Sequence, residues 1–120
     1  MTSKAVDAES LIARVREIAM ALPDATEKLS HGEPSWFVNG RQFATMDNNH
    51  HGSGHVAVVC NAEEGAQEAL VAAEPEHFFV PPYVGGKGWL GMRVDRGIDW
   101  KLVADLLAQA YRKTAAKKRR

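Results

Sequence analysis

Histidine is the residue type in this chain best suited to chemistry, and three of the five histidines lie in one short stretch, His50-His51-Gly-Ser-Gly-His55. Imidazole nitrogens bind zinc, copper or nickel, but a closed site needs about four ligands, and the glycines leave these three unfixed. We therefore predict no dedicated metal site and no cofactor. Adventitious metal binding by this loop stays an open alternative.

His31 stands close to a carboxylate in the segment Ser30-His31-Gly32-Glu33-Pro34. Such a histidine can act as an acid, a base or a ligand. No nucleophile motif lies nearby, so we favour a turn in which Gly32 adopts an unusual backbone conformation and His31 forms a hydrogen bond. The one cysteine, Cys60, ends an apolar run with no cation near it, which predicts a buried thiol. The sequence therefore predicts a protein that is not an enzyme.

The glycine-rich run Gly85-Gly86-Lys87-Gly88 has backbone N–H groups that could cradle a phosphate. It is not a P-loop, because Gly88 stands where Ser or Thr is required and a strand is expected to follow. We favour a turn that lets Tyr83 and Trp89 pack closely and line a cleft beside His31. The candidate ligand cleft consists of His31, Glu33, Trp36, Tyr83 and Trp89, although Trp36 and Trp100 are also typical core residues.

Charge is distributed unevenly along the chain, although fifteen cations balance fifteen acids. Residues 112–120 hold six cations and no acid, so residues 1–111 carry nine cations against fifteen acids, a net charge of −6. A basic end of this kind is either a contact for nucleic acid or a solubilising tail. The candidate phosphate-binding cations are Arg41, Lys87, Arg93, Arg112, Lys113, Lys117, Lys118, Arg119 and Arg120.

Length and composition indicate one globular domain, since the chain has 120 residues of which 45% are hydrophobic. One cysteine permits no intramolecular disulfide, which suits a reducing compartment. No apolar run reaches the roughly 18 residues of a membrane span, and the first residues lack the apolar stretch of a signal peptide. We therefore expect a cytoplasmic protein without membrane contact, with a domain over residues 1–112 and a basic tail over residues 113–120.

The hydrophobic pattern predicts helices over about residues 8–22, 62–73 and 99–112. Asp7 and Asp99 are expected to cap the outer two, and Asn61 with Glu64 to form a capping box for the middle one. Strands are expected over residues 34–38, 41–46, 55–60 and 89–94, with a short extra strand near Phe78 as an alternative. Asn39-Gly40 predicts a two-residue turn that pairs Trp36 with Phe43.

These elements follow one another in the order α-β-β-β-α-β-α. Consecutive strands and a tight hairpin favour an antiparallel sheet, and amphipathic helices need a face to cover. The sequence therefore predicts an α+β fold, a two-layer sandwich with the helices packed on one face of the sheet. Trp36, Val38 and Phe43 are expected on the core face, and Phe37 on the other.

Three longer stretches, which include several of these motifs, together resemble a known protein family. They are Ala21-Leu-Pro-Asp running to Ser30-His-Gly-Glu-Pro-Ser-Trp-Phe-Val-Asn-Gly-Arg-Gln-Phe-Ala44, then Phe79-Val-Pro-Pro-Tyr-Val-Gly-Gly-Lys-Gly-Trp89, and Asp99-Trp100 with the helix through Ala110-Tyr-Arg112. In this order they resemble the YjbR/MmcQ-like family of small bacterial proteins over about residues 14–118. The resemblance implies a fold related to the frataxin-like (CyaY-like) sandwich, DNA binding by a double-wing arrangement, and no catalytic activity.

From the resemblance and the basic end we expect a monomeric, non-enzymatic protein that binds DNA weakly and without sequence preference. The alternative is a module that binds a small molecule or a peptide in the cleft around His31, Tyr83 and Trp89. A third hypothesis is a frataxin-like metal handler. It is a poor match, because Arg14 and Arg16 stand in the first helix, where frataxins are acidic.

Overall fold

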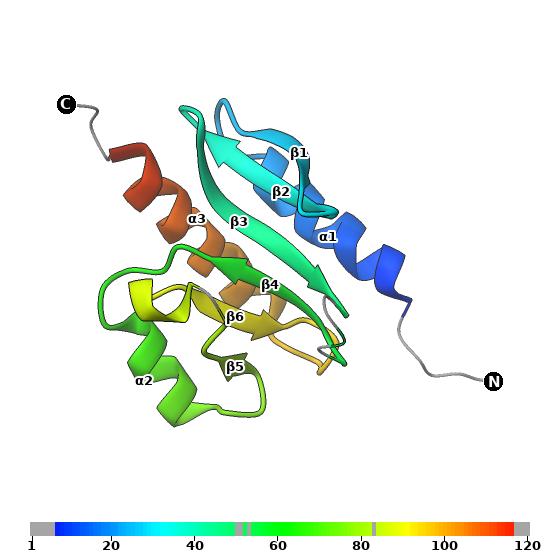
Figure 1. Ribbon diagram of the computed structural model, residues 1–120, viewed down its shortest axis with the longest axis vertical. Helices are drawn as coiled ribbons and strands as arrows, with labels where there is room; N and C mark the ends of the chain where they lie inside the picture. Colours follow the sequence, from blue (N-terminus) through cyan, green and yellow to red (C-terminus); the bar gives the residue numbers. More distant parts are fainter. Residues whose placement is uncertain (1–6, 50–51, 53, 83, 117–120) are drawn as a thin grey trace.

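Six strands form one antiparallel sheet in the part of the chain that the computed structural model describes, residues 7–49, 52, 54–82 and 84–116 (Figure 1). The strands are β1 (Thr26–Ser30), β2 (Glu33–Val38), β3 (Arg41–Asn48), β4 (Val56–Cys60), β5 (Phe78–Phe79) and β6 (Leu90–Arg93). Their order across the sheet is β1-β2-β3-β4-β6-β5. The helices are α1 (Ala8–Met20), α2 (Ala66–Ala73) and α3 (Trp100–Ala116), with the short 3₁₀ helix η2 at Gly85–Lys87.

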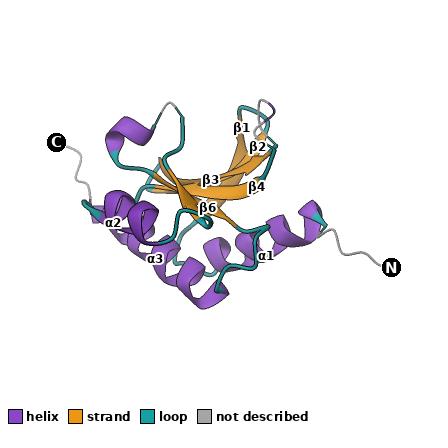
Figure 2. Ribbon diagram, turned by 90° about the horizontal axis from the view of Figure 1, so that it is seen from below, coloured by secondary structure: helices purple, strands orange, loops and turns teal. Residues whose placement is uncertain are grey.

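The helices α1 and α3 lie on one face of the sheet, as Figure 2 shows. α1 buries Leu11, Val15 and Ala19. The buried residues of α3 are Val103, Leu106, Leu107, Ala110 and Thr114. The sheet meets the helices with Trp36, Val38, Phe43, Met46, Val58, Cys60, Leu90 and Met92. Each fully buried aliphatic side chain stabilises the fold by about 1.5–3 kcal/mol, so this interface holds the two layers together. The predicted two-layer α+β sandwich is confirmed.

The remaining α-helix, α2, lies at the β5 end of the sheet, and none of its residues is fully buried. Ala66, Leu70 and Val71 pack against the core from this edge. On the opposite side of the sheet from α1 and α3, η2 and the chain around it rise above the strands. The sheet therefore has one face covered by helices and one face that is largely open.

Side-chain caps start two of the helices where the sequence predicts them. Asp7 Oδ1 accepts a hydrogen bond from Glu9 N at 3.3 Å, and Asp99 Oδ1 accepts one from Lys101 N at 3.0 Å. The predicted capping box at Asn61 is wrong, because α2 begins only after Gly65 (φ +87°). The Asn61 side chain instead donates to Thr114 Oγ1 of α3, at 2.8 Å.

Two tight turns set the register of the first three strands. The predicted turn at Asn39–Gly40 is present, with φ values of +54° and +75°, and the same geometry recurs at His31–Gly32 with +54° and +81°. Both match a type I′ turn, which needs positive φ at both central residues. The second turn joins β1 to β2. β1 was not predicted, because its sequence shows no alternation of apolar and polar residues.

The predicted pairing of Trp36 with Phe43 is wrong by one residue. Phe37 faces Gln42 and Trp36 faces Ala44, so Phe43 is the extra residue of a β-bulge. A bulge turns two neighbouring side chains out of strict alternation. Phe43 and Ala44 are therefore both buried, while Phe37 lies on the other face as predicted.

The helix α3 runs beyond the predicted end of the domain at residue 112. Thr114 is buried, and Lys113 Nζ donates to the Ala62 carbonyl oxygen at 2.7 Å. Residues 113–116 thus belong to the helix and not to a tail, because their side chains anchor α3 to the loop before α2. The remaining tail residues, 117–120, lie outside the described residues. No helix in the described ranges is long and apolar enough to cross a membrane.

Candidate ligand-binding site

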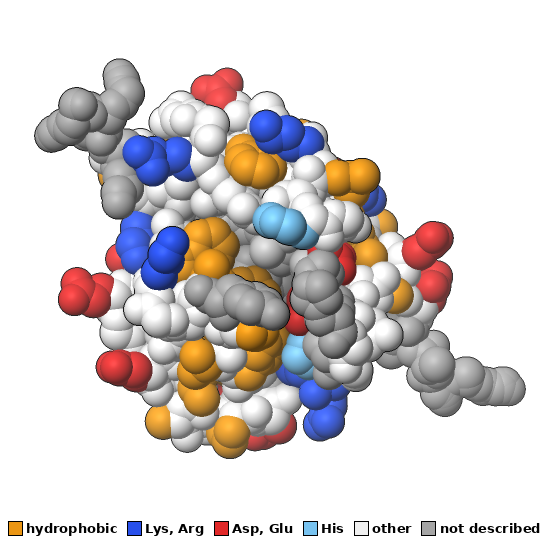
Figure 3. Space-filling model, in the orientation of Figure 1, with side chains coloured by type: hydrophobic (Ala, Val, Ile, Leu, Met, Phe, Trp, Pro, Cys, Tyr) orange, Lys and Arg blue, Asp and Glu red, His pale blue; other side chains and the backbone are white. Residues whose placement is uncertain are grey.

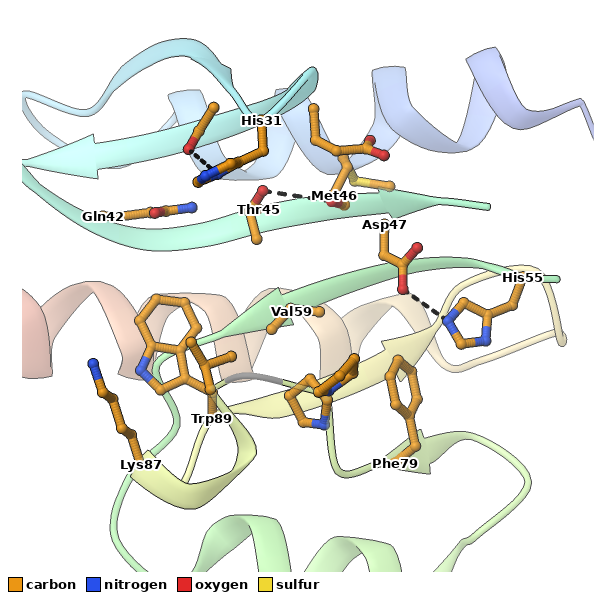
Figure 4. A pocket seen from close by; sticks show the side chains of 15 residues that line it. His31, Gln42, Thr45, Met46, Asp47, His55, Val59, Phe79, Lys87 and Trp89 are labelled. Atoms are coloured by element: carbon orange, nitrogen blue, oxygen red, sulfur yellow. Dashed lines mark hydrogen bonds and ion pairs between the residues drawn. The ribbon is translucent and has the colours of Figure 1, made fainter. Parts of the chain in front are cut away.

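A cavity of about 900 Å³ opens on the face of the sheet that α1 and α3 leave uncovered. Thr45 of β3 and Val59 of β4 are cross-strand partners and form its floor. One wall comes from the β1–β2 turn and the other from the chain between β5 and β6 (Figure 4). Hydrophobic side chains gather at the centre of this face, with histidine and acidic side chains beside them (Figure 3).

One end of the cavity carries an Asp–His pair. Asp47 lies in β3 and His55 just before β4, and the hairpin register brings them together: His55 Nε2 lies 2.9 Å from Asp47 Oδ2. Both side chains are about 15% exposed. The His55 ring also packs against Phe79, with ring centroids 4.6 Å apart. These contacts fix the orientation of both polar side chains.

A second carboxylate, Glu33, lines the same cavity at the start of β2. It is only 8% exposed. Its two carboxylate oxygens lie 3.3 and 3.4 Å from the backbone N–H of Asn48, which donates to them. A buried carboxylate needs such donors, since its desolvation is costly. Glu33 is thereby held against the end of β3, at Asn48, which directly follows Asp47 in the sequence.

The wall between β5 and β6, which carries the aromatic side chains of Phe79 and Trp89, depends on two glycines. Phe79 lies directly over Gly91, where an added Cβ would come within 2.3–2.5 Å of three ring atoms. Val80 approaches Gly85 in the same way, within 2.4 Å of an added Cβ. Both positions require the absence of a side chain because the neighbouring side chain occupies its space.

The helix α2 fixes the same wall from behind. Gln67 Nε2 donates to the carbonyl oxygens of Gly85 and Trp89, at 2.8 and 2.6 Å. One side chain thus ties both ends of η2 to the body of the protein. The wall that holds Trp89 is therefore preformed.

Comparison with known proteins decides the family. The family model for YjbR matches residues 20–113, more than half of the chain. The chain belongs to the YjbR family. The family expected from the three sequence stretches is therefore confirmed.

The same fold occurs in the crystal structure of the Deinococcus radiodurans protein DR2400, described as a DUF419 domain. The two chains are 18% identical and superpose with a TM-score of 0.74, over 88% of this chain and 79% of that one. At this identity the likeness establishes the fold alone. No curated protein matches the chain significantly.

In this YjbR domain, three residues of the predicted cleft do meet. His31, Glu33 and Trp89 all line the cavity. Trp36 does not, because it is fully buried on the helix-covered face, where its indole N–H donates to Glu27 Oε1 at 2.9 Å. Tyr83 lies outside the described residues.

Several cavity residues were missed by sequence reasoning, namely Thr45, Asp47, Val59 and Phe79. His55 was considered only as a metal ligand, and the structure instead pairs it with Asp47. The signal in the sequence is alternation: Thr45 and Asp47 are two residues apart on β3 and share the open face. His50 and His51 lie outside the described residues, and within those described no group of three His, Cys, Asp or Glu side chains is placed to hold a metal.

The candidate phosphate-binding cations of the YjbR domain differ in their exposure and in their partners. Arg41, Lys87 and Arg112 are exposed. Arg93 makes two hydrogen bonds of 3.0 Å to Asp95, which raise its pKa, and Lys113 is bonded to Ala62. Lys117, Lys118, Arg119 and Arg120 lie outside the described residues.

The cysteine lies in the core, as predicted. Cys60 is fully buried at the end of β4, on the face that the helices cover. Burial raises the pKa of its thiol to about 12. Because the thiolate is the nucleophile, a thiol with such a pKa is chemically inert at neutral pH.

Proposed function

We propose that the protein is a non-enzymatic binding module that takes a small organic molecule into the cavity on its open face. The observation that carries this proposal is the cavity itself. Its volume of about 900 Å³ lies in the range of known ligand sites, and its lining combines the aromatic side chains of Phe79 and Trp89 with a few fixed polar groups. Sites of this composition bind by apolar contact and select by their polar groups.

A binding role fits the chemistry of the polar groups better than catalysis does. The Asp47–His55 pair would need a nucleophile or a bound reactant beside it. Among the described residues, the hydroxyl groups of Ser35 and Thr45 are hydrogen-bonded to each other, with Oγ and Oγ1 2.7 Å apart. Cys60 lies on the other face of the sheet.

The fixed walls support binding because a preformed site loses little conformational entropy when a ligand enters. Gln67 holds η2, Gly91 leaves room for the end of the Phe79 ring, and Phe79 in turn packs on His55. The site is built on strands and on a loop tied at both ends. Such support favours specific binding of one ligand over non-specific binding of apolar molecules.

Filling the cavity tests the proposal. Val59→Phe places a ring on the cavity floor, and Leu29→Phe adds the same ring on β1 at a side chain that is 71% exposed and outside the cavity. In a fragment screen by thermal shift, we expect wild-type protein and Leu29→Phe to be stabilised by the same fragments, and Val59→Phe by none of them. Equal responses of all three proteins would exclude this cavity as the site.

Weak DNA binding is the second candidate function, favoured by the six cations and no acids of residues 112–120. It would place phosphates at the C-terminal end of α3, because Glu33 and Asp47 in the cavity repel a polyanion. A contact of this kind carries no information on base sequence. The two candidate functions therefore use different surfaces.

The salt dependence of DNA affinity tests this second candidate. The variant should carry Gln at positions 117–120 and keep residues 113–116, because Lys113 and Thr114 anchor α3. If the basic end binds phosphates, the slope of log K against log salt falls by about 0.9 for each phosphate that the variant no longer neutralises. Equal slopes for both proteins would show that the basic end does not bind DNA.

A further inference from the structure

We propose that the ligand of this cavity is an organic anion, a flat apolar body that carries a carboxylate or phosphate group. This inference rests on the proposed function, because it names the class of molecule that the cavity takes. It is carried by hydrogen-bond donors that gather at one end of the cavity and have ligand-accepting capacity to spare. Their residues are His31, Gln42 and Lys87.

The three donors lie at the end of the cavity away from His55. In Figure 4, His31 and Gln42 lie on one side of this end, and Lys87 lies on the other side together with Trp89. His31 comes from the β1–β2 turn, Gln42 from the start of β3 and Lys87 from η2. Segments far apart in the sequence thus bring donors to one place.

These donors are not used up by contacts within the part of the chain that the structure describes. There, the Lys87 ammonium and the Gln42 carboxamide make no hydrogen bond or ion pair. His31 Nδ1 lies 3.3 Å from Ser30 Oγ, and when that hydroxyl donates, the neutral ring carries its proton on Nε2. Nε2 is then a third donor. An anionic oxygen accepts from these groups without displacing a protein contact.

The charge at this end of the cavity is positive. Lys87 is the one Lys or Arg that lines the cavity among the described residues, and the acids that line it, Glu33 and Asp47, are tied to the other end of β3. Asp47 lies five positions after Gln42, which at about 3.3 Å per residue is roughly 15 Å along the strand. Physiological salt screens charges over about 8 Å, so these acids do not cancel the attraction of Lys87 for an anion.

The flat body of the ligand is indicated by Trp89, beside the donors. Its side chain is half-buried and lines the cavity, with Val59 on the floor next to it (Figure 4). A planar ring packs on an indole by offset stacking or edge to face. Gln67 holds the Trp89 carbonyl oxygen at 2.6 Å, so this surface is fixed before a ligand arrives. Because an exposed lysine attracts an anion only weakly, the ring contact supplies most of the affinity and the donors supply the selectivity.

Five small probes separate the ring from the charge. Benzoate and phenyl phosphate carry a ring with an anion, benzamide carries the ring alone, benzamidine the ring with a cation, and acetate the anion alone. Each is titrated into the full chain at constant ionic strength, and binding is followed by the amide signals of Thr45 and Val59 and the indole signal of Trp89. We expect the tighter of the two aromatic anions to bind about fivefold more tightly than benzamide or benzamidine, and acetate to leave the Trp89 signal unmoved.

Substitutions at the donor end check that it causes this preference. Lys87→Met should reduce the preference for the tighter anion over benzamide by about threefold or more. Lys101→Met, at an exposed residue of α3, removes the same charge and should leave the preference unchanged. Gln42→Glu places a carboxylate among the donors and should make benzamide the tighter ligand, whereas Gln109→Glu, at a half-buried residue of α3, should not. Continued binding of benzamide shows that each variant still forms the cavity.

The outcomes distinguish this inference from the proposed function. Tighter binding of benzoate identifies the anionic group as a carboxylate, and tighter binding of phenyl phosphate identifies it as a phosphate. If benzamide or benzamidine binds at the same residues as tightly as both anions, or if Lys87→Met and Gln42→Glu leave the preference unchanged, the ligand class is wrong and the cavity remains a binding site. If acetate reproduces the shifts of benzoate, the requirement for a ring is wrong. If no probe moves the signals of the cavity residues, the inference and the proposed function both fail.

Discussion

His31 combines an unfavourable backbone conformation with a place at the rim of the cavity. Its φ of +54° lies in the left-handed region, and its side chain is exposed, with Nδ1 3.3 Å from Ser30 Oγ. Asn, Asp or Gly is the common choice at the first central position of a type I′ turn. A residue that fits its turn poorly is a candidate for a functional role.

The substitution His31→Asn tests that role. Because asparagine adopts this conformation more readily, we expect the free energy of unfolding to stay equal or to rise by about 0.5 kcal/mol. Ligand affinity should fall, since the imidazole is lost from the cavity wall. Urea unfolding and a fragment titration measure the two effects, and a loss of stability without a loss of affinity would contradict the assignment.

Glu27 is the residue that makes the buried Trp36 possible. Its Oε1 accepts from the Trp36 indole N–H at 2.9 Å and from Arg16 Nε at 2.8 Å. Glu27→Ala leaves the indole N–H without this acceptor, which should cost about 2 kcal/mol of unfolding free energy. Glu17→Ala on the exposed side of α1 is the control and should change it by less than about 0.5 kcal/mol. Equal effects in urea unfolding would contradict this role.

The same carboxylate predicts a pH dependence of stability. The hydrogen bond from Arg16 lowers the pKa of Glu27 from its ordinary value of 4.5. A group whose pKa is lower in the folded state stabilises the protein above its unfolded pKa, and this stabilisation is lost as the pH falls through the folded pKa. The stability difference between wild type and Glu27→Gln should therefore be constant above pH 4.5 and shrink in more acidic solution. A difference that grows on acidification would refute it.

At the scale of elements, the strongly periodic segments were predictable and the irregular ones were not. α1 and α3 follow from their apolar stripes, and the hairpin at Asn39–Gly40 from its turn residues. β1 was missed because an edge strand exposed to water needs no alternation, so only the turn at His31–Gly32 indicates it. The capping box failed because Asn61 bonds a residue 53 positions away. Local patterns cannot show such a partner.

The contact between β5 and β6 gives a prediction at this scale. Gly91→Ala places a methyl group within 2.5 Å of the Phe79 ring, so β5 must shift. We expect a loss of about 1–3 kcal/mol in unfolding free energy and weaker ligand binding, because Phe79 also holds His55. Gly86→Ala is the matched control, since nothing lies within 4 Å of the added methyl group.

A second substitution separates steric conflict from the loss of glycine itself. Phe79→Leu removes the ring, so the double variant Gly91→Ala with Phe79→Leu should be destabilised by less than the sum of the two single variants. Strict additivity would show that the ring does not set the requirement for Gly91. Urea unfolding of the four proteins completes this cycle.

At the scale of the whole molecule, the fold leaves one face of its sheet largely open, and the cavity lies there (Figure 2). The cavity joins the β1–β2 turn, the middle of β3 and β4 and the chain around η2, which are up to about sixty residues apart. His31, Glu33 and Trp89 could be placed together from the sequence because family motifs contain them. Asp47 and Val59 could not, because their meeting depends on the register of β3 and β4, which only the folded sheet defines.

A two-dimensional amide and indole NMR map of the full chain with a mixture of aromatic fragments tests the binding role of the open face most directly. We predict shifts confined to the open face, at residues such as Thr45, Val59 and Trp89, with Leu107 on the buried side of α3 unmoved. Shifts centred on the exposed side of α3, or none at all, would contradict the claim that the open face of this YjbR domain is its binding site.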